Sequence, residues 1–305
     1  MICSDSFGRD FKLYVCREND QIVGGCSFFV KKSLLYRTAS STIHMTPYGG
    51  FVLEPKNHKV RDNEHLQSKI IRSLCNMIEH NGYHAIRCAN SPDFIDVRPF
   101  TWNGWDSDVL YTYFLGLDTD LEKKISKEAR WTIRKAMKHN IAVKKLHDPE
   151  IFYGLYDNTY RRQNLKVPAD LSFITQMLRM VEEKGRGEMW VAQNASGENI
   201  ASEILTYDNR RAYRWAAASN EAHRSFGATT HLLFEIFKDL KAREIREINL
   251  MAGNMENLSN FVTQFNPNLV PYYAVKKTIY KKFLKNYFAY AISSILGFFY
   301  LTNLY

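Results

Sequence analysis

The sequence predicts an α/β protein in which one strand-and-helix unit occurs twice, and two observations carry this prediction. In each half of the 305 residues, segments rich in β-branched and aromatic residues are followed by an amphipathic helix and then by another strand. No Pro-rich or Gly/Ser-rich linker separates the halves, so we expect two closely packed domains, each with a mixed sheet flanked by helices. The length is sufficient for two hydrophobic cores.

The first half begins with a predicted hairpin, in which FKLYVCREND and QIVGGCSFFV flank a polar turn at residues 18–20. A strand-like FVL follows, and an amphipathic helix is expected from about Asp62 to Glu79, ended by Asn81-Gly82. YHAIRCA and DVLYTYFLGL are the next predicted strands. Asp118 then opens one long expected helix through LEKKISKEARWTIRKAMKHN.

The second half follows the same order. IAVKKL is a predicted strand, and two helices are expected at residues 150–164 and 171–184. EMWVAQ, ENIASEILTY and RRAYRWAAAS read as three successive strands. A helix over 229–243, the strand EINLMAG, a helical or looped segment over 254–265 and the strand VPYYAVKK complete the expected elements.

The composition is that of a globular protein with a positive surface. Hydrophobic residues make up 45% and charged residues 24% of the chain, and the net charge is +9. This charge favours an anionic partner, which could be a phosphate, a nucleic acid or a membrane surface, although a lysine surplus for solubility gives the same value. The five cysteines form no C-x-x-C pair, and the first residues contain no apolar signal segment, so we expect a cytoplasmic, reducing environment.

The last residues form a separate apolar segment. Residues 286–305 contain no charge and are just long enough to cross a bilayer, and lysines precede them as on a cytoplasmic flank. Contact with the inner face of a membrane and a C-terminal helix docked on the protein both agree with this pattern.

Metal and covalent chemistry have no support in the sequence. His80 and His84 have a ligand-like spacing, but Gly82 lies between them at a predicted helix end, and no zinc-binding motif is present. No G-x-S-x-G motif or recognisable catalytic cysteine occurs. We therefore expect no metal in the site.

One turn has the character of a phosphate-binding loop. In HRSFGATTHLLFEIF, residues 223–237, Arg224, Gly227 and Ala228 lie between a predicted strand and a long helix. Backbone N–H groups at a helix N-terminus bind phosphate well, and a glycine permits close approach. An ordinary helix start with a turn glycine would have the same local sequence.

The segment 128–145 contains a basic helix. Arg130, Arg134 and Lys138 are spaced four residues apart and form one stripe, beside an apolar face that must pack. Such a stripe can hold the phosphates of a nucleotide-linked or lipid-linked precursor, or of a nucleic acid, or it can be a solvated face. A nucleic-acid binder would show a steep salt dependence.

Taken together, these segments resemble the FemAB-like family of double-GNAT proteins, which includes the peptidoglycan bridge aminoacyltransferases and acetyltransferase-like proteins of polysaccharide biosynthesis. The resemblance rests on RWTIRKAMKHNIAV, on the loop with Arg224 and Gly227, and on the later strand followed by Gly253, Phe261 and Phe265. It covers about residues 11–280. Asn249 stands where the family usually has aspartate, and Val262 stands where the tRNA-dependent members have a lysine.

The resemblance implies tandem GNAT-like domains at residues 1–127 and 141–285, connected by a basic helix at 128–140 and followed by the segment 286–305. It implies that Arg224, Gly227 and Ala228 bind the donor. Amine acylation needs a base and an acid. Glu203 has the location of the base in many GNAT enzymes, although an edge or outward-facing side chain would agree with the same sequence. Tyr213, Tyr272 and Tyr273 are candidates for the acid, and His223, near Gly227, is a candidate for either role. Tyr160 and Arg161, together with the basic stripe, are the expected acceptor-binding residues.

The resemblance implies an acyltransferase that moves an acyl group to an amine of a phosphorylated or lipid-linked cell-envelope glycan or peptide precursor. The donor would be acyl-CoA, which Val262 favours, or aminoacyl-tRNA as in the peptidoglycan bridge enzymes. A non-catalytic, membrane-associated scaffold of the same fold is the alternative from another class. DNA is not an expected partner.

Overall fold

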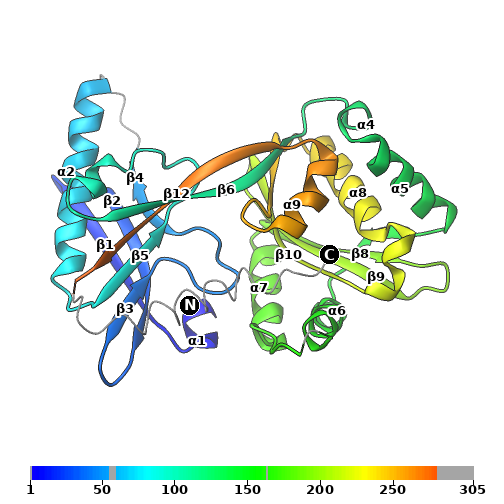
Figure 1. Cartoon of the computed structure of the whole chain (residues 1–305), viewed down its shortest axis with the longest axis horizontal. Coiled ribbons are helices and arrows are strands. Elements are labelled where there is room, and N and C mark those ends of the chain that lie inside the picture. The colour runs from blue at the N-terminus through cyan, green and yellow to red at the C-terminus, as the bar shows by residue number, and fades with distance from the viewer. Residues whose placement is uncertain (1, 55–59, 163, 280–305) are drawn as a thin grey trace. The chain divides into compact units, whose positions relative to one another are not determined.

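A computed structural model describes residues 2–54, 60–162 and 164–279. The chain divides into two compact units (Figure 1). Unit 1 comprises Met1–Leu110 together with the described residues from Pro271 on, and unit 2 comprises Tyr111–Val270. The boundaries fall within the strands β6 (Asp106–Gly116) and β12 (Asn268–Thr278).

Unit 1 is a mixed sheet with the strand order β1-β2-β3-β5-β12, in which β4 also pairs with β2. Its other strands are β1 (Asp10–Glu18), β2 (Gln21–Lys32), β3 (Arg37–Ser40), β4 (Gly50–Leu53) and β5 (Ala85–Ala89). β1 and β2 are antiparallel, whereas β3 and β5 are parallel. The helix α2 (Val60–Glu79) packs its buried face on the strands β1 and β2, and Ile70, Ile71, Leu74 and Ile78 join the core of this unit. Two short helices, α1 (Ile2–Ser6) and α3 (Arg98–Thr101), complete the unit.

Unit 2 is a mixed sheet with the order β6-β11-β10-β9-β8-β7. Its strands after β6 are β7 (Ala142–Lys145), β8 (Gly187–Gln193), β9 (Asn199–Tyr207), β10 (Arg211–Ser219) and β11 (Glu247–Met251). Its helices are α4 (Leu121–Lys124), α5 (Lys127–Lys138), α6 (Pro149–Arg161), α7 (Leu171–Glu183), α8 (Ala228–Ala242) and α9 (Glu256–Val262), with the 3-10 turns η1 (Glu221–Phe226) and η2 (Thr263–Phe265). The helices α5 and α8 share one core with the sheet, and α6 and α7 lie on the opposite side in Figure 1.

The predicted α/β class with sheets flanked by helices is confirmed, and the strands expected from composition are present. One expectation is wrong: the long helix after Asp118 is two helices. Ile125 has an extended backbone, and the hydroxyl of Ser126 caps α5 by accepting from the Ala129 amide at 3.0 Å. Four short elements, α1, β3, α3 and η1, were not predicted because they have no clear hydrophobic period.

The basic segment that we expected to connect two domains lies inside unit 2. The helix α5 packs against α8, and its buried residues Ala129, Ile133 and Ala136 belong to the core of that unit. The predicted apolar face is therefore confirmed at these three residues, whereas Met137, which the sequence also placed on this face, is 59% exposed.

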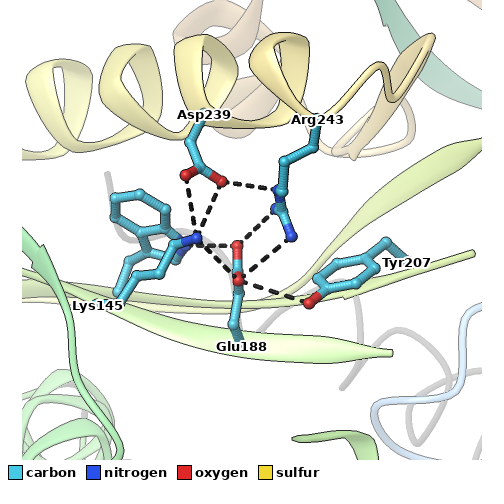
Figure 2. A network of polar contacts seen from close by, with 6 residues as sticks. Lys145, Glu188, Tyr207, Asp239 and Arg243 are labelled. Atoms are coloured by element: carbon cyan, nitrogen blue, oxygen red, sulfur yellow. Dashed lines mark hydrogen bonds and ion pairs between the residues drawn. The ribbon is translucent and has the colours of Figure 1, made fainter. Parts of the chain in front are cut away.

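A charged network holds the C-terminal half of α8 on the sheet (Figure 2). The Glu188 carboxylate on β8 lies 3.2 Å from the Lys145 ammonium and 2.7 Å from the Arg243 guanidinium. Asp239 of α8 contacts the same two cations at 3.0 and 2.9 Å. Two cations and two anions thus compensate each other, and the Trp190 indole also donates to Glu188 at 2.9 Å. This network fixes α8, whose other end forms the site described below.

In the part of the chain that the structure describes, no helix combines the length and apolar character needed to cross a membrane. The segment 286–305, which we expected either to contact a membrane or to dock on the protein, lies outside the described residues.

Candidate functional site

The parallel strands β10 and β11 diverge in the middle of unit 2. They pair only over three positions, from Arg211 with Glu247 to Tyr213 with Asn249. Both strands are irregular immediately afterwards, β10 between Arg214 and Ala216 in its pairing with β9, and β11 after Asn249 in its pairing with β6. Beyond this point β10 continues to Ser219 beside β9 while β11 turns away, so the sheet opens at its centre.

The diverging end of β11 is held by a dense set of hydrogen bonds. The Asn249 side-chain oxygen accepts from the Thr112 hydroxyl at 2.7 Å and from the Met251 amide at 2.8 Å. Asn254 bonds both the N–H and the C=O of Tyr111, at 2.8 and 2.9 Å, in the manner of a neighbouring strand. Since the bonds to Asn249 use its oxygen as an acceptor, asparagine can perform there the same task as the aspartate usual in the family.

The strand β10 leads through η1 to Gly227, which precedes α8 in a left-handed conformation with φ +75°. A Cβ at this position would lie 2.9 Å from the Thr132 carbonyl oxygen and 2.5 Å from its methyl group. Glycine is therefore required both for the backbone conformation and for the close approach of the turn to α5.

A hollow lies at this N-terminus of α8 and extends to the end of β10. It is lined by Thr132, Ile200, Ser219, Asn220, His223, Gly227, Ala228, Thr229, Thr230, Phe261 and Gln264. None of these residues is acidic, and Gly227 provides no side chain to cap the first N–H groups of a helix of 15 residues. The positive end of a helix dipole, with backbone amides that the capping residue's side chain does not bind, suits a phosphate group. The residues present therefore fit the phosphate end of an acyl-CoA donor.

His223 is the predicted catalytic residue that the structure places in this hollow. Its Nε2 lies 3.2 Å from the Glu198 carboxylate, and its Nδ1 is buried without a hydrogen-bond partner in the described structure. Its ring also contacts Phe226. His223 is thus positioned at the end of the hollow beside α8 rather than where the strands first diverge.

Glu203, the predicted base, is completely buried and forms a two-point ion pair with Arg214 of the adjacent strand. The distances are 2.8 Å to Nε and 2.6 Å to Nη2. Burial raises the pKa of the Glu203 carboxyl, and the Arg214 guanidinium opposes this shift. Arg214 in turn lies over the ring of Phe261, which lines the hollow. Both carboxylate oxygens are occupied, so this geometry supports a structural role for Glu203.

Tyr213, the predicted acid, is the last residue of β10 that pairs with β11. It is therefore close to the point where the sheet opens. Arg224 lies within η1, between His223 and Gly227. Ala228 is the first residue of α8 and is buried.

The basic stripe of α5 does not face the hollow as one unit. Arg130 donates to the carbonyls of Glu122 and Ile125 at 2.9 and 2.7 Å, so it ties α5 to the preceding turn. Arg134 and Lys138 are exposed. Thr132, which lines the hollow, lies two residues before Arg134 and hence roughly 160° away around the helix. The stripe and the hollow are therefore on different faces of α5.

The two residues predicted for the acceptor differ in accessibility. Tyr160 is buried in α6 against Tyr156, and burial raises its pKa. Arg161 is exposed and forms an ion pair with Asp157 one turn earlier. Their helix ends near the hollow, because the Thr159 hydroxyl lies 3.5 Å from the Ser219 carbonyl.

Several residues of the hollow were not predicted as site residues: Thr132, Ser219, Asn220 and Gln264. Phe261, which also lines the hollow, was named only as part of the resemblance. The end of the strand RRAYRWAAAS could have indicated Ser219 and Asn220, but no local pattern identifies Thr132 or Gln264. Among the described residues, no group of histidine, cysteine, aspartate and glutamate side chains could hold a metal ion. Val262 is completely buried, so the position of the family lysine belongs to the core.

Residues 119–257 match the family described as the acetyltransferase (GNAT) domain. This range contains the diverging strands, Gly227 and α8. No curated protein sequence matches the chain.

Solved structures with 11–12% identity show the same fold. FemX aligns with a TM-score of 0.67 at 12% identity, over 88% of this chain and 89% of that chain. The C-terminal domain of a putative lysylphosphatidylglycerol synthetase from Agrobacterium fabrum aligns with a TM-score of 0.62 at 11% identity, over 97% and 91%. A tandem GNAT protein from the clavulanic acid biosynthesis pathway aligns with a TM-score of 0.53 at 12% identity, over 88% and 83%. The predicted double-GNAT resemblance and the acyltransferase class are confirmed at this level.

Proposed function

Residues 119–257 match the GNAT acetyltransferase domain family, and from this premise we propose that the protein moves an acyl group from acyl-CoA to an amine of a cell-envelope glycan or peptide precursor. One observation carries the choice of acyl-CoA. The opening between β10 and β11 lies beside a hollow without acidic residues at the N-terminus of α8. An extended thioester with a phosphorylated end fits this combination of a gap between strands and a helix terminus.

The donor, when bound, supplies an activated acyl carbon; the new bond to the amine nitrogen replaces the bond to sulfur. The amine must lose a proton, and the departing sulfur must gain one. We assign Tyr213 to the second task, because it stands where the strands part. We assign His223 to the phosphate end of the donor, because it lines the hollow beside Gly227. In this proposal Glu203 orients β9 and β10 through Arg214 and does not exchange protons with substrate.

The class of acceptor rests on the fold relatives. These relatives are FemX and a putative lysylphosphatidylglycerol synthetase. The name of the second includes a phospholipid product. An amine on a phosphorylated or lipid-linked envelope precursor would suit the net charge of +9. The exposed Arg134, Lys138 and Arg161 stay candidates for contacts with the anionic part of such an acceptor.

Aminoacyl-tRNA is the alternative donor, and Val262 argues against it. The lysine that the tRNA-dependent members carry would have to stand at a position that is completely buried here. Neither donor requires a metal.

Calorimetric titration of the purified full chain with acetyl-CoA tests the proposal. We expect saturable binding that weakens at least tenfold in Arg224→Ala, since this residue is the predicted donor contact in η1. Arg179→Ala is the matched control, because Arg179 is an exposed arginine on α7 of the same unit. Tyr213→Phe should bind acetyl-CoA normally and lose turnover.

Three other outcomes would each be decisive. Transfer from aminoacyl-tRNA without acetyl-CoA binding would replace the donor. Binding of neither donor, with vesicle association retained, would support a scaffold. Binding to nucleic acid that falls steeply with salt would support a nucleic-acid-binding function.

A further inference from the structure

The hairpin between β2 and β3 in unit 1 ends in two exposed leucines. Lys32 pairs with Arg37, and the Ser33 amide donates to the Tyr36 carbonyl at 2.8 Å, so Leu34 and Leu35 are the two central residues of a tight turn. Leu34 is 99% and Leu35 is 73% exposed. In Figure 1 this turn forms the free end of the hairpin, away from α2.

The leucines serve neither the conformation of the turn nor its packing. Neither has a positive φ, so the turn does not need the glycine or asparagine that left-handed positions favour, and a polar residue could stand at either position. The leucines also bury nothing at the tip. Two large apolar side chains left exposed at positions that do not require them indicate a function rather than a folding requirement.

The hairpin around the tip is strongly basic. Lys12, Lys31, Lys32 and Arg37 lie on it or on the adjoining strand β1, and Asp10 is their one acidic neighbour on these strand ends. Lys32 contacts Asp10 at 2.5 Å, and the pKa of the Asp10 carboxyl is lowered by Lys32 first and also by Lys12 and Arg37. Lys31 and Lys32 are consecutive in a strand, so cations occupy both faces of the hairpin just behind the leucines.

Arg37 anchors the hairpin directly behind the tip. Its guanidinium donates to the Asn81 carbonyl at 2.9 Å and lies 4.7 Å from the centre of the Tyr83 ring. The outer face of the neighbouring strands is also apolar, with Phe11 and Phe29 in ring contact and Leu13 66% exposed. The anchored hairpin therefore exposes two leucines at its tip and basic side chains directly behind them, and the outer face of its strands is apolar.

We propose that the Leu34–Leu35 tip inserts into the surface of a membrane that contains anionic lipids, with the lysines of the hairpin contacting the headgroups. A small apolar tip ringed by cations complements a bilayer, which offers hydrocarbon below a layer of negative charge. A protein partner would more commonly meet a broad patch with aromatic anchors at its centre. This inference does not depend on the donor site in unit 2, and acetyl-CoA binding would be unaffected by its failure.

The test places a fluorophore at the tip of the full chain. In a Cys3→Ser/Cys16→Ser background, where the remaining cysteines Cys26, Cys75 and Cys88 are buried, Leu34→Cys is labelled with an environment-sensitive dye. We expect a blue shift with vesicles of phosphatidylcholine and phosphatidylglycerol, and none with phosphatidylcholine alone. Ile95→Cys, at a 72% exposed apolar position elsewhere in unit 1, should show no shift.

A second variant separates insertion from folding. Leu34→Ser/Leu35→Ser removes the apolar tip without touching a buried side chain, and neither position has a positive φ, so the thermal unfolding temperature should not fall. Co-sedimentation with the anionic vesicles should weaken at least tenfold. Vesicle binding without a dye response at position 34, or a double variant that binds anionic vesicles as well as the parent, would overturn the proposal, and attachment through residues 286–305 alone would give that result.

Discussion

Replacing Glu203 with glutamine should destabilise unit 2 by about 3 to 5 kcal/mol, because it leaves the charged Arg214 without its counter-ion in a buried position. The side chains of Glu203 and Arg214 are 1% and 5% exposed, so water cannot take the place of the carboxylate. Glutamine can still accept one of the two hydrogen bonds, which places the expected loss toward the lower end of this range.

Urea unfolding followed by circular dichroism measures this loss, and a double variant gives the control. Glu203→Gln/Arg214→Met removes both members of the pair and leaves an uncharged interior, so it should be markedly more stable than Glu203→Gln alone. Arg214→Met would also forfeit the contact with the Phe261 ring, so complete recovery is not expected.

Activity adds a second readout that separates a structural from a catalytic Glu203. Below its unfolding midpoint, Glu203→Gln should keep its turnover within about threefold, whereas loss of a general base costs roughly 100-fold or more. A loss of stability below 1 kcal/mol, or a collapse of turnover in folded protein, would refute the reasoning.

Three further predictions concern unit 2. Gly227→Ala should lower stability by roughly 1 to 3 kcal/mol and weaken acetyl-CoA binding, since its Cβ would press on Thr132 and the backbone has φ +75°; urea unfolding and calorimetry check both, and an unchanged protein would show that the turn is not constrained. Asn254→Ala should cost about 1 to 2 kcal/mol in the same unfolding assay, because the N–H and C=O of Tyr111 lose their partner, and a neutral effect would mean that water replaces it. His231 is buried and its pKa is lowered by burial, so the unfolded chain takes up the proton first and stability should fall as pH drops through 6.5; His231→Leu should flatten the stability profile between pH 7 and 5, and an unchanged slope would contradict this origin.

The sequence predicted the parts of the site that depend on local chemistry. Gly227 and the start of α8 followed from a turn glycine between a strand and a periodic helix, and both are present. The packing face of α5 followed from its period, and Ala129, Ile133 and Ala136 are buried there. The helix break was also readable in principle, because Ser126 followed by Glu128 is a helix start signal.

The parts that depend on pairing between distant segments were not predictable. Glu203 lies opposite Ala217, and Arg214 lies opposite Leu205, so their meeting requires both the register and the irregularity of β9 with β10. Periodicity predicts that a side chain faces the core, but it does not predict which side chain of another strand it contacts. The same limit applies to the basic stripe. Helix geometry puts the stripe on a different face from Thr132, but that Thr132 is the residue facing the hollow follows only from how α5 packs on α8.

Binding of acetyl-CoA to the full chain, measured by calorimetry for the parent, Arg224→Ala and Arg179→Ala, tests the central claim most directly. We predict saturable binding by the parent and by Arg179→Ala, and at least tenfold weaker binding by Arg224→Ala. Absence of binding by the parent, or equal binding by all three proteins, would contradict a donor site at the N-terminus of α8.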